Sequence, residues 1–422
     1  MFSLFQKENR RLHLNMGYLL LAQVLFVLTN LYINYEANRM WDVEGFAVFN
    51  LLKRFGSFVI YPLLVGAGIG IPRYISFLKR RRADQGMEYL WAGMAWFTGL
   101  FALFAVVMRC FPEPLLRAFG PAAINPDLWW WAVFGFIFSQ GLFVLITAYY
   151  RGFMAFMQVA FLNIGIMSVF PLGMLWLAAD VWQYFVYYAC FSTGLLMVIL
   201  AVLQRGKHIR RSAIRLKAIR LFRYGWPRIG AEVGLFGLEF IPVFGVSLFV
   251  GLEASAYLSL TFILLKLAAM LFELAGSMVL PYYGQLFRNE TRAVFAAKVN
   301  RLVLYGALAA LVIAVLFYLV TPFLVAVFFP GLSLSAGYAR MVLPVFPVYA
   351  VYLLLRNILD IVSDRAYNTF NLLLAMGMLV LILAVGIGFR QPLIYQAGVI
   401  IGPYVFLGLL TYRRWLLLSA KL

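Results

Sequence analysis

Histidine, cysteine and acidic residues are scarce in this sequence of 422 residues. It contains two histidines, two cysteines and 16 acidic residues. Cys110 and Cys190 supply neither a disulfide framework nor a paired metal motif, and we expect both to be packing residues in apolar surroundings. The chain also lacks the phosphate-cradling GxxxxGK[ST] motif, so we expect no ATPase of its own. With so few nucleophiles, bases and metal ligands, the sequence argues against an enzyme.

The composition instead indicates a bilayer. Hydrophobic residues make up 64% of the chain and charged residues 12%, whereas a soluble domain is about half apolar and about a quarter charged. The net charge of +19 is carried by short basic clusters between long apolar runs. A nucleic-acid binder would carry it on a polar, soluble surface. The charge therefore indicates membrane topology and not a nucleic-acid partner.

Long apolar runs occupy nearly the whole sequence. A helix needs about 20 apolar residues to cross the hydrocarbon core. On this basis we predict twelve membrane spans. Their windows are 14–35, 46–77, 89–111, 128–150, 154–178, 181–203, 224–251, 255–284, 299–320, 339–360, 367–389 and 393–412.

The basic clusters predict the orientation of these spans. Lysine and arginine accumulate in short cytoplasmic segments. With the N-terminus inside, most basic residues fall on the cytoplasmic side, including Lys79–Arg82 after the second span and the run from Arg205 to Arg223. We therefore predict a multi-pass membrane protein with both termini in the cytoplasm.

The run at 205–223 is the longest polar interruption, and it contains no acidic residue. It divides an N-terminal lobe, residues 1–204, from a C-terminal lobe, residues 224–422, each with six helices. Its leucines and isoleucines alternate with basic residues, which suits an amphipathic segment on the anionic inner leaflet. A plain linker and a regulatory or partner-binding segment both remain open. We predict an all-α integral membrane fold with two pseudo-symmetric six-helix lobes.

Ionisable residues inside the spans are candidate functional groups. They are costly in hydrocarbon and therefore mark water-filled cavities, transport pathways or buried pairs. The basic ones are Lys53, Arg54, Arg73, Arg228, Lys266 and Arg356, and the acidic ones are Glu232, Glu239, Glu273 and Asp360.

Spacing and depth separate these candidates. Arg356 and Asp360 are four residues apart on one helix face, which fits a structural ion pair as well as a functional site. Arg73 and Arg228 lie near cytoplasmic helix ends, where snorkelling to the headgroups is sufficient. Lys53, with Arg54 beside it, lies deeper and has no nearby carboxylate in the sequence. Pairing with another helix would satisfy these two cations, but their depth favours an anionic ligand.

Glycine and proline mark candidate moving parts. Gly66, Gly68, Gly70 and Pro72 crowd the second span, and Pro242 interrupts the seventh. Such residues permit kinks where neighbouring helices or water satisfy the freed backbone groups. Small residues also allow close helix packing. We treat these five positions as a candidate gate or hinge.

Two stretches carry a family likeness. They are "GAGIGIPRYISFLKRRR" at the end of the second span and "LFRYGWPRIGAEVG…FVGLEASAYLSL" at the start of the second half. With the twelve-helix pattern, they resemble polysaccharide flippases of the O-antigen (Wzx) type in the multidrug/oligosaccharidyl-lipid/polysaccharide (MOP) exporter superfamily. The likeness covers essentially the whole chain. In many relatives an acidic residue followed by arginine lies nine residues before the glycine that matches Gly251. Here that position is Pro242, and Glu239 is one turn earlier.

The resemblance implies a MATE-like flippase for cell-surface polysaccharide synthesis, such as O-antigen of lipopolysaccharide, capsule or exopolysaccharide. Its substrate would be an undecaprenyl-diphosphate-linked oligosaccharide, moved by alternating access from the inner to the outer leaflet of a bacterial cytoplasmic (inner) membrane. The basic candidates would then bind the diphosphate or sugar. The acidic ones would bind a coupling H⁺ or Na⁺, or transport would be pulled by polymerisation. We expect no metal or other cofactor, no nucleic acid, a monomer, and as partners the bilayer and the polysaccharide polymerase and chain-length machinery.

Two rival interpretations remain. A cation-coupled multidrug exporter of the same fold would need an acidic or apolar cavity, and the basic second span argues against it. A non-transporting membrane scaffold of a polysaccharide synthase would tolerate neutralisation of Lys53 and Arg54, whereas a flippase should not.

Overall fold

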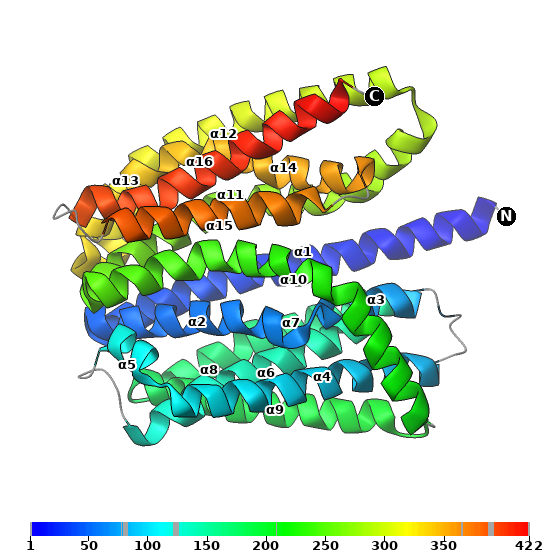
Figure 1. Cartoon of the computed structure of the whole chain (residues 1–422), viewed down its shortest axis with the longest axis horizontal. Helices are drawn as coiled ribbons and strands as arrows, with labels where there is room; N and C mark the ends of the chain where they lie inside the picture. Colours follow the sequence, from blue (N-terminus) through cyan, green and yellow to red (C-terminus); the bar gives the residue numbers. More distant parts are fainter. Residues whose placement is uncertain are drawn as a thin grey trace. The chain divides into compact units, whose positions relative to one another are not determined.

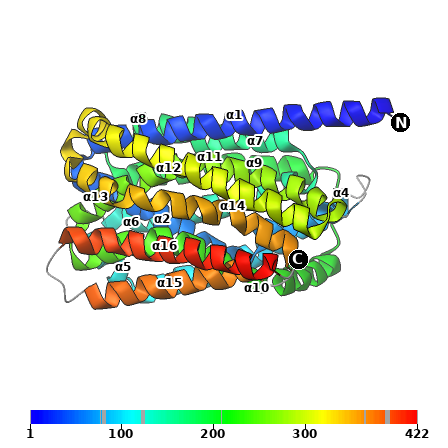
Figure 2. The same ribbon diagram turned by 90° about the horizontal axis from the view of Figure 1, so that it is seen from above.

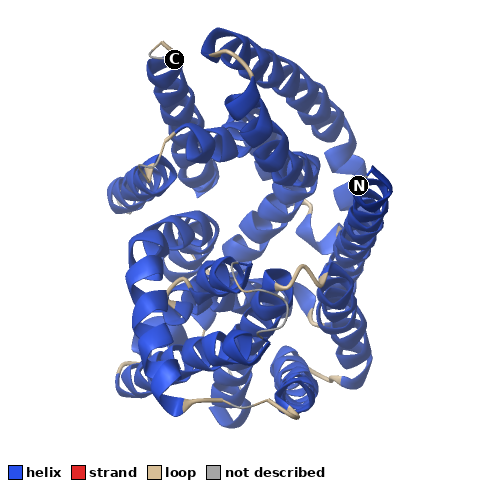
Figure 3. Cartoon of the chain, turned by 90° about the vertical axis from the view of Figure 1, so that its right-hand side faces the viewer, coloured by secondary structure: helices blue, strands red, loops and turns tan. Residues whose placement is uncertain are grey.

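The computed structural model describes residues 2–76, 78, 83–120, 126–207, 209–363, 366–386 and 392–420. Within these ranges the regular structure is helical and includes no strand (Figure 3). The predicted cytoplasmic anchor Lys79–Arg82 lies outside the described residues, as do His208, Arg365, Arg390 and Lys421.

The chain divides into two compact units, which are described separately. Unit 1 comprises Met1–Leu116 and Pro121–Ile229, and unit 2 comprises Arg117–Gly120 and Gly230–Leu422. The boundary near Ile229 falls inside a long helix, α10, which begins at Arg211 and so includes most of the basic run at 205–223.

The helices of the first half are α1 (Phe2–Met40), α2 (Asp42–Leu64), α3 (Ala67–Ser76), α4 (Ala83–Cys110), α5 (Glu113–Phe119), α6 (Pro126–Gly152), α7 (Phe156–Ile164), the π-helix η2 (Gly165–Val169), α8 (Phe170–Leu177) and α9 (Val181–Gln204). Those that follow are α10 (Arg211–Phe249), α11 (Leu252–Asn289), α12 (Arg292–Phe328), η3 (Pro330–Leu332), α13 (Leu334–Val342), η4 (Leu343–Val345), α14 (Phe346–Val362), α15 (Tyr367–Gly386) and α16 (Pro392–Ser419).

The predicted all-α membrane architecture is confirmed. Ten helical segments within the described residues are long and apolar enough to cross a membrane, and they overlap the second to the eleventh predicted windows. The first and twelfth windows fall within α1 and α16, which are helical over 39 and 28 residues.

Unit 1 is built around α6. This helix packs against α2, α3, α4 and α9, and the long helices run side by side (Figure 1). Large aromatic side chains fill the space between them. Phe49 contacts Tyr184 and Phe185 at ring-centroid distances of 5.4 and 5.6 Å, and Phe136 lies 5.0 Å from Phe185. These offset and edge-on contacts fix the relative positions of α2, α6 and α9.

Unit 2 is built around α14, which packs against α11, α12 and α16 (Figure 2). One buried cluster includes Phe295, Leu355 and Trp415, and the indole Nε1 of Trp415 donates to Asn300 Oδ1 at 2.8 Å. The outward side of α12 is apolar: Leu308 and Leu319 are 52% and 64% exposed. A large exposed apolar side of this kind fits contact with lipid, not water.

Cys110 and Cys190 are exposed and form no disulfide. The expectation that both are packing residues is therefore wrong. Each lies on a membrane-spanning helix, α4 or α9, and an exposed side chain on such a helix can face lipid. Apolar surroundings in the sequence therefore do not imply burial within the protein.

The second predicted span is broken between α2 and α3. Val65 and Gly66 both adopt left-handed backbone conformations, with φ of 48° and 69°. Gly225 of α10 packs directly against this break. A Cβ added at Gly225 would lie 1.9 Å from the Val65 carbonyl oxygen, and one added at Gly66 would lie 2.5 Å from the Gly225 Cα. The two backbones therefore meet with no side chain between them.

The other candidate hinge positions lie inside helices. Gly68, Gly70 and Pro72 belong to α3. A Cβ added at Gly70 would lie 2.9 Å from Leu221 Cδ2, so this glycine permits close helix packing. Pro242 lies inside α10, which continues past it to Phe249 without a break in the helix.

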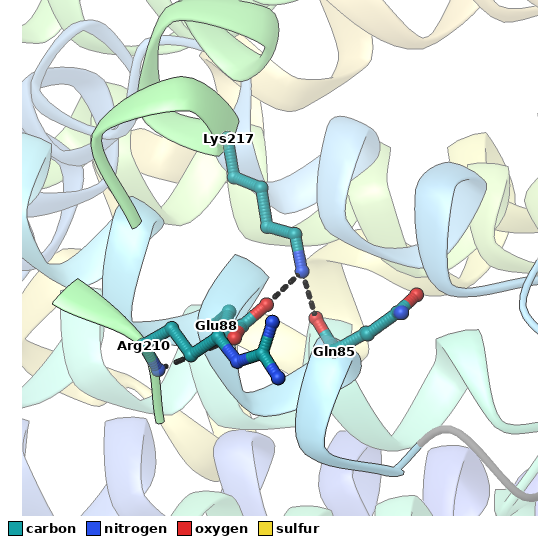
Figure 4. Close-up of polar contacts among 4 residues, drawn as sticks. All are labelled: Gln85, Glu88, Arg210 and Lys217. Carbon is teal, nitrogen blue, oxygen red and sulfur yellow. Dashed lines mark hydrogen bonds and ion pairs between the residues drawn. The ribbon is translucent and has the colours of Figure 1, made fainter. Parts of the chain in front are cut away.

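The first part of α10 is fastened to α4 by a buried ion pair. Lys217 contacts the Glu88 carboxylate, and both side chains are nearly inaccessible, at 11% and 7% exposure. Lys217 Nζ also donates to the Gln85 carbonyl at 3.0 Å, and the Arg210 amide donates to Glu88 Oε1 at 3.3 Å (Figure 4). Trp96 Nε1 donates to the Ala218 carbonyl at 2.9 Å. The segment after Gln204 is thus a docked helix.

We expect Gly225→Ala to lower the free energy of unfolding by about 1–3 kcal/mol, because the added methyl group overpacks a backbone contact that cannot be relieved by a side-chain rotation. The thermal midpoint of the detergent-purified chain measures the effect. Gly194→Ala on α9 is the matched control, since a Cβ there meets nothing within 4 Å. Equal midpoints for wild type and Gly225→Ala would show that the backbone contact does not form.

We expect Lys217→Met to cost about 3–5 kcal/mol of stability, because it leaves the Glu88 carboxylate buried without its cation. Adding Glu88→Leu should recover most of the loss, since both charges are then removed. Arg205→Met, at an exposed position outside α10, should leave the thermal midpoint unchanged. A Lys217→Met variant with wild-type stability would contradict a buried pair.

Candidate functional site

Unit 1 contains a cavity of about 290 Å³. Helices α1, α2, α6, α8 and α9 contribute side chains to it, together with η2. Seven of its sixteen lining residues are aromatic, and among the described residues that line it Lys53 is the one charged side chain. The aromatic lining residues are Phe26, Tyr61, Phe136, Phe143, Tyr184, Phe185 and Tyr188, and the polar ones are Asn30, Lys53, Ser57 and Gln140.

Lys53 lies midway along α2 and is half-buried. Its Nζ donates to Asn30 Oδ1 at 2.6 Å and lies 4.8 Å from the ring centre of Phe49. These two contacts, with a neutral amide and a π-system, stabilise the ammonium. Lys53 therefore places an ammonium group in the cavity wall at mid-span.

Asparagines next to Lys53 form a short network. Asn34 Nδ2 donates to the Asn30 carbonyl at 2.6 Å, and Asn50 Nδ2 donates to Asn34 Oδ1 at 3.1 Å. Asn34 and Asn50 are buried. The network ties α1 to α2 and holds Asn30, the acceptor from Lys53, in position.

Gln140 and Tyr188, which also line the cavity, are held by hydrogen bonds. Gln140 Nε2 donates to the Tyr188 hydroxyl at 2.6 Å, and that hydroxyl donates to the Ile166 carbonyl at 3.1 Å. Ile166 belongs to the π-helix η2, whose wider turn leaves carbonyls outside the α-helical pattern. Single-turn π-helices inserted in α-helices are frequent at functional sites.

Arg54 is half-buried on α2 but is not among the residues that line the cavity. Neighbouring residues on a helix point about 100° apart, so the two adjacent cations diverge as the sequence predicts. Of this predicted pair, Lys53 is the one that the structure places in the cavity.

Arg73 and Arg228, predicted in different spans, meet on one ring. The guanidinium carbons of Arg73 and Arg228 lie 4.6 and 3.9 Å from the centre of the Tyr224 ring. Arg228 Nη1 also donates to the Tyr224 carbonyl at 2.8 Å. Arg73 is exposed and Arg228 is half-buried. Two forked donors beside one ring form a group suited to phosphate oxygens.

Unit 2 holds charges of both signs. Lys266 Nζ and Glu239 Oε2 form an ion pair at 2.7 Å, in which the glutamate side chain is 13% exposed and the lysine side chain 50%. Glu273 interacts electrostatically with both and with Arg356. These four predicted residues therefore form one cluster with no net charge. Its two cations thus share the site with carboxylates.

The remaining acidic candidates lie elsewhere. Asn368 Nδ2 of α15 donates to the Arg356 carbonyl at 2.7 Å and to Asp360 Oδ1 at 2.8 Å, so an amide connects the C-terminal part of α14 to α15. Glu232 is half-buried on α10.

Asn30, Gln140 and Tyr188 are site residues that the sequence reasoning missed. Neutral polar residues do not stand out in a hydropathy pattern, so their position in the cavity depends on tertiary packing. One signal was present: Asn30 and Asn34 are four residues apart in an otherwise apolar span, which puts two amides on one helix face.

Comparisons with known proteins identify the fold. No family model matches the sequence, and neither does any curated protein. An inward-facing multidrug resistance MATE family transporter of the MOP superfamily aligns with a TM-score of 0.71 and 13% identity, over 94% of each chain. The lipid II flippase MurJ, in an inward closed conformation, aligns with a TM-score of 0.72 and 13% identity, over 97% of this chain and 90% of that one.

A MATE transporter in complex with MaL6 aligns with a TM-score of 0.62 and 12% identity, over 96% of both chains. At such low identity the similarity is one of fold. The chain is thus a multi-pass membrane protein with the transporter fold that MATE exporters and MurJ share in the MOP superfamily.

Proposed function

We propose that the chain is a flippase that moves an undecaprenyl-diphosphate-linked oligosaccharide from the inner to the outer leaflet of a bacterial inner membrane. The translocated lipid-linked oligosaccharide would be used to synthesise a surface polysaccharide such as O-antigen. The observation that carries this proposal is Lys53, a cation at mid-span in an aromatic-lined cavity with no carboxylate among its described lining residues. The fold, shared with a lipid flippase, is consistent with it.

The cavity chemistry suits the headgroup of such a lipid. A diphosphate needs cationic hydrogen-bond donors in a hydrated space, and the Lys53 ammonium provides them. Aromatic faces can pack on the apolar faces of sugar rings, while Asn30 and Gln140 offer amides to hydroxyl groups. At about 290 Å³ the cavity is suited to part of the headgroup, while the prenyl chain stays in lipid.

Arg73 and Arg228, the two arginines beside the Tyr224 ring, would contact the diphosphate before it reaches Lys53. Arg73 follows the α2–α3 break and Lys53 precedes it, so movement at residues 65–66 would change their separation. In the proposed cycle the diphosphate passes from Arg73 and Arg228 to Lys53 during alternating access. The basic candidates of unit 2, Lys266 and Arg356, would bind the substrate from the C-terminal lobe.

The same proposal assigns energy coupling to four acidic residues that would bind H⁺ or Na⁺. They are Glu232, Glu239, Glu273 and Asp360. Glu239 is the best placed of them, because protonation would release Lys266 from its ion pair. The proposed protein works as a monomer with both termini in the cytoplasm, beside the polymerase and chain-length machinery.

A multidrug exporter is the second candidate function. The similarity to MATE transporters favours it as strongly as the similarity to MurJ favours a flippase. An exporter of organic cations, however, would have to move its substrate past the positive charge of Lys53. A scaffold without transport activity would have no need for a charge in this cavity.

We expect Lys53→Met to abolish export in a flippase-deleted cell in which the wild-type chain restores the surface polysaccharide. The substitution keeps the length of the side chain and removes its charge, so the diphosphate loses its cation. Surface polysaccharide should fall by at least about tenfold, since a charge-assisted contact contributes roughly 1.5–3 kcal/mol. The measurement is polysaccharide staining at matched membrane abundance.

Lys298→Met is the control, because Lys298 forms an exposed pair with Glu290 at 2.9 Å and lies in unit 2. It should export like wild type. Full export by Lys53→Met would reject the assigned cavity. Failure of the wild-type chain in its native polysaccharide background, together with increased resistance to organic cations, would support the exporter instead.

A further inference from the structure

Four arginines share the outward side of the first part of α10. Arg211, Arg215, Arg220 and Arg223 are all exposed, and the sequence 205–223 contains no acidic residue to neutralise them. Spacings of three to five residues keep them on one broad side of the helix. We call this side, residues 211–226, the basic face.

Large apolar side chains lie among these arginines. Leu216, Ile219 and Trp226 are 53%, 42% and 63% exposed. Exposed aliphatic groups with a tryptophan and a row of arginines are typical of helices in the membrane interface. A helix surrounded by water would leave these three side chains in an unfavourable environment.

The opposite side of the same helix is fixed to unit 1. Lys217, Leu221 and Gly225 are buried at intervals of four residues. Lys217 holds Glu88, and Gly225 contacts the α2–α3 break. These contacts prevent the helix from rotating, so the basic face must point away from the unit.

The first part of α10 also has the orientation of an interfacial helix. In Figure 1 this part of α10 runs at a steep angle to α4 and α9, at one end of unit 1. Figure 3 is a view of that end. Pro227 follows this part and lacks the N–H of a regular helical turn, which favours a bend. If α4 and α9 span the bilayer, this part of α10 lies along its surface.

We propose that the basic face of α10 binds anionic phospholipid headgroups of the inner leaflet. Charge complementarity selects phosphate-bearing lipids with a net negative charge over zwitterionic lipids, and Trp226, Leu216 and Ile219 insert among the acyl chains. The bound lipids would lie next to Tyr224 and the α2–α3 break. They would therefore stabilise the backbone conformation that residues 65–66 have in this structure. This inference does not depend on which substrate the protein transports.

The test uses the full-length chain and two lipids, phosphatidylglycerol and phosphatidylcholine. Lipid retained by the detergent-purified protein is titrated by native mass spectrometry, and the thermal midpoint is measured with each lipid. We expect wild type to bind phosphatidylglycerol at least about tenfold more tightly, a preference that weakens with salt. In the variant Arg215→Gln/Arg220→Gln/Arg223→Gln the preference should mostly disappear.

Arg39→Gln/Arg109→Gln/Arg340→Gln is the matched control, with the same loss of charge at three exposed arginines outside α10. It should keep the preference of wild type. Equal thermal midpoints in phosphatidylcholine will show that both triple variants are folded. The proposal is overturned if the α10 variant keeps the wild-type preference, or if the control loses as much. If the α10 variant keeps the wild-type preference, an acidic protein becomes the alternative partner of the basic face.

Discussion

The ammonium of Lys53 lies halfway along a membrane-spanning helix, and the side chains around it in unit 1 must stabilise a charge at that depth. A charge at this depth is costly unless dipoles or water stabilise it. Asn30 and the Phe49 ring provide part of that stabilisation, and the cavity admits water for the rest. Among the described lining residues Lys53 is the one charged side chain, so it is the group of this cavity that can attract an anion.

A second constraint operates where α2 gives way to α3. Gly66 and Gly225 bring two backbones together, so the position of the break depends on α10. The ion pair of Lys217 with Glu88 holds the same part of α10 to α4. Lys53 lies before the break and Arg73 after it, which places two cations of unit 1 on segments that a movement at the break would shift.

The membrane fold could be predicted from the sequence because length and hydropathy are local properties. Lys53 could be identified for a similar reason, since a charge stands out in an apolar run. The partners could not: Asn30 is 23 residues from Lys53, and Gln140 is 48 residues from Tyr188. The meeting of Arg73 and Arg228 on Tyr224, and the pairing of Lys217 with Glu88, likewise depend on how helices pack, which periodicity does not report.

The central claim is that the chain carries a lipid diphosphate across the bilayer with the help of Lys53. The most direct test is flipping in vesicles that contain the purified chain and an undecaprenyl-diphosphate-linked sugar labelled with a fluorophore. A membrane-impermeant quencher measures the label in the outer leaflet over time. The account predicts that wild type makes the inner-leaflet label accessible, whereas Lys53→Met does not. Wild-type vesicles that behave like protein-free vesicles, or a Lys53→Met variant as fast as wild type, would contradict the claim.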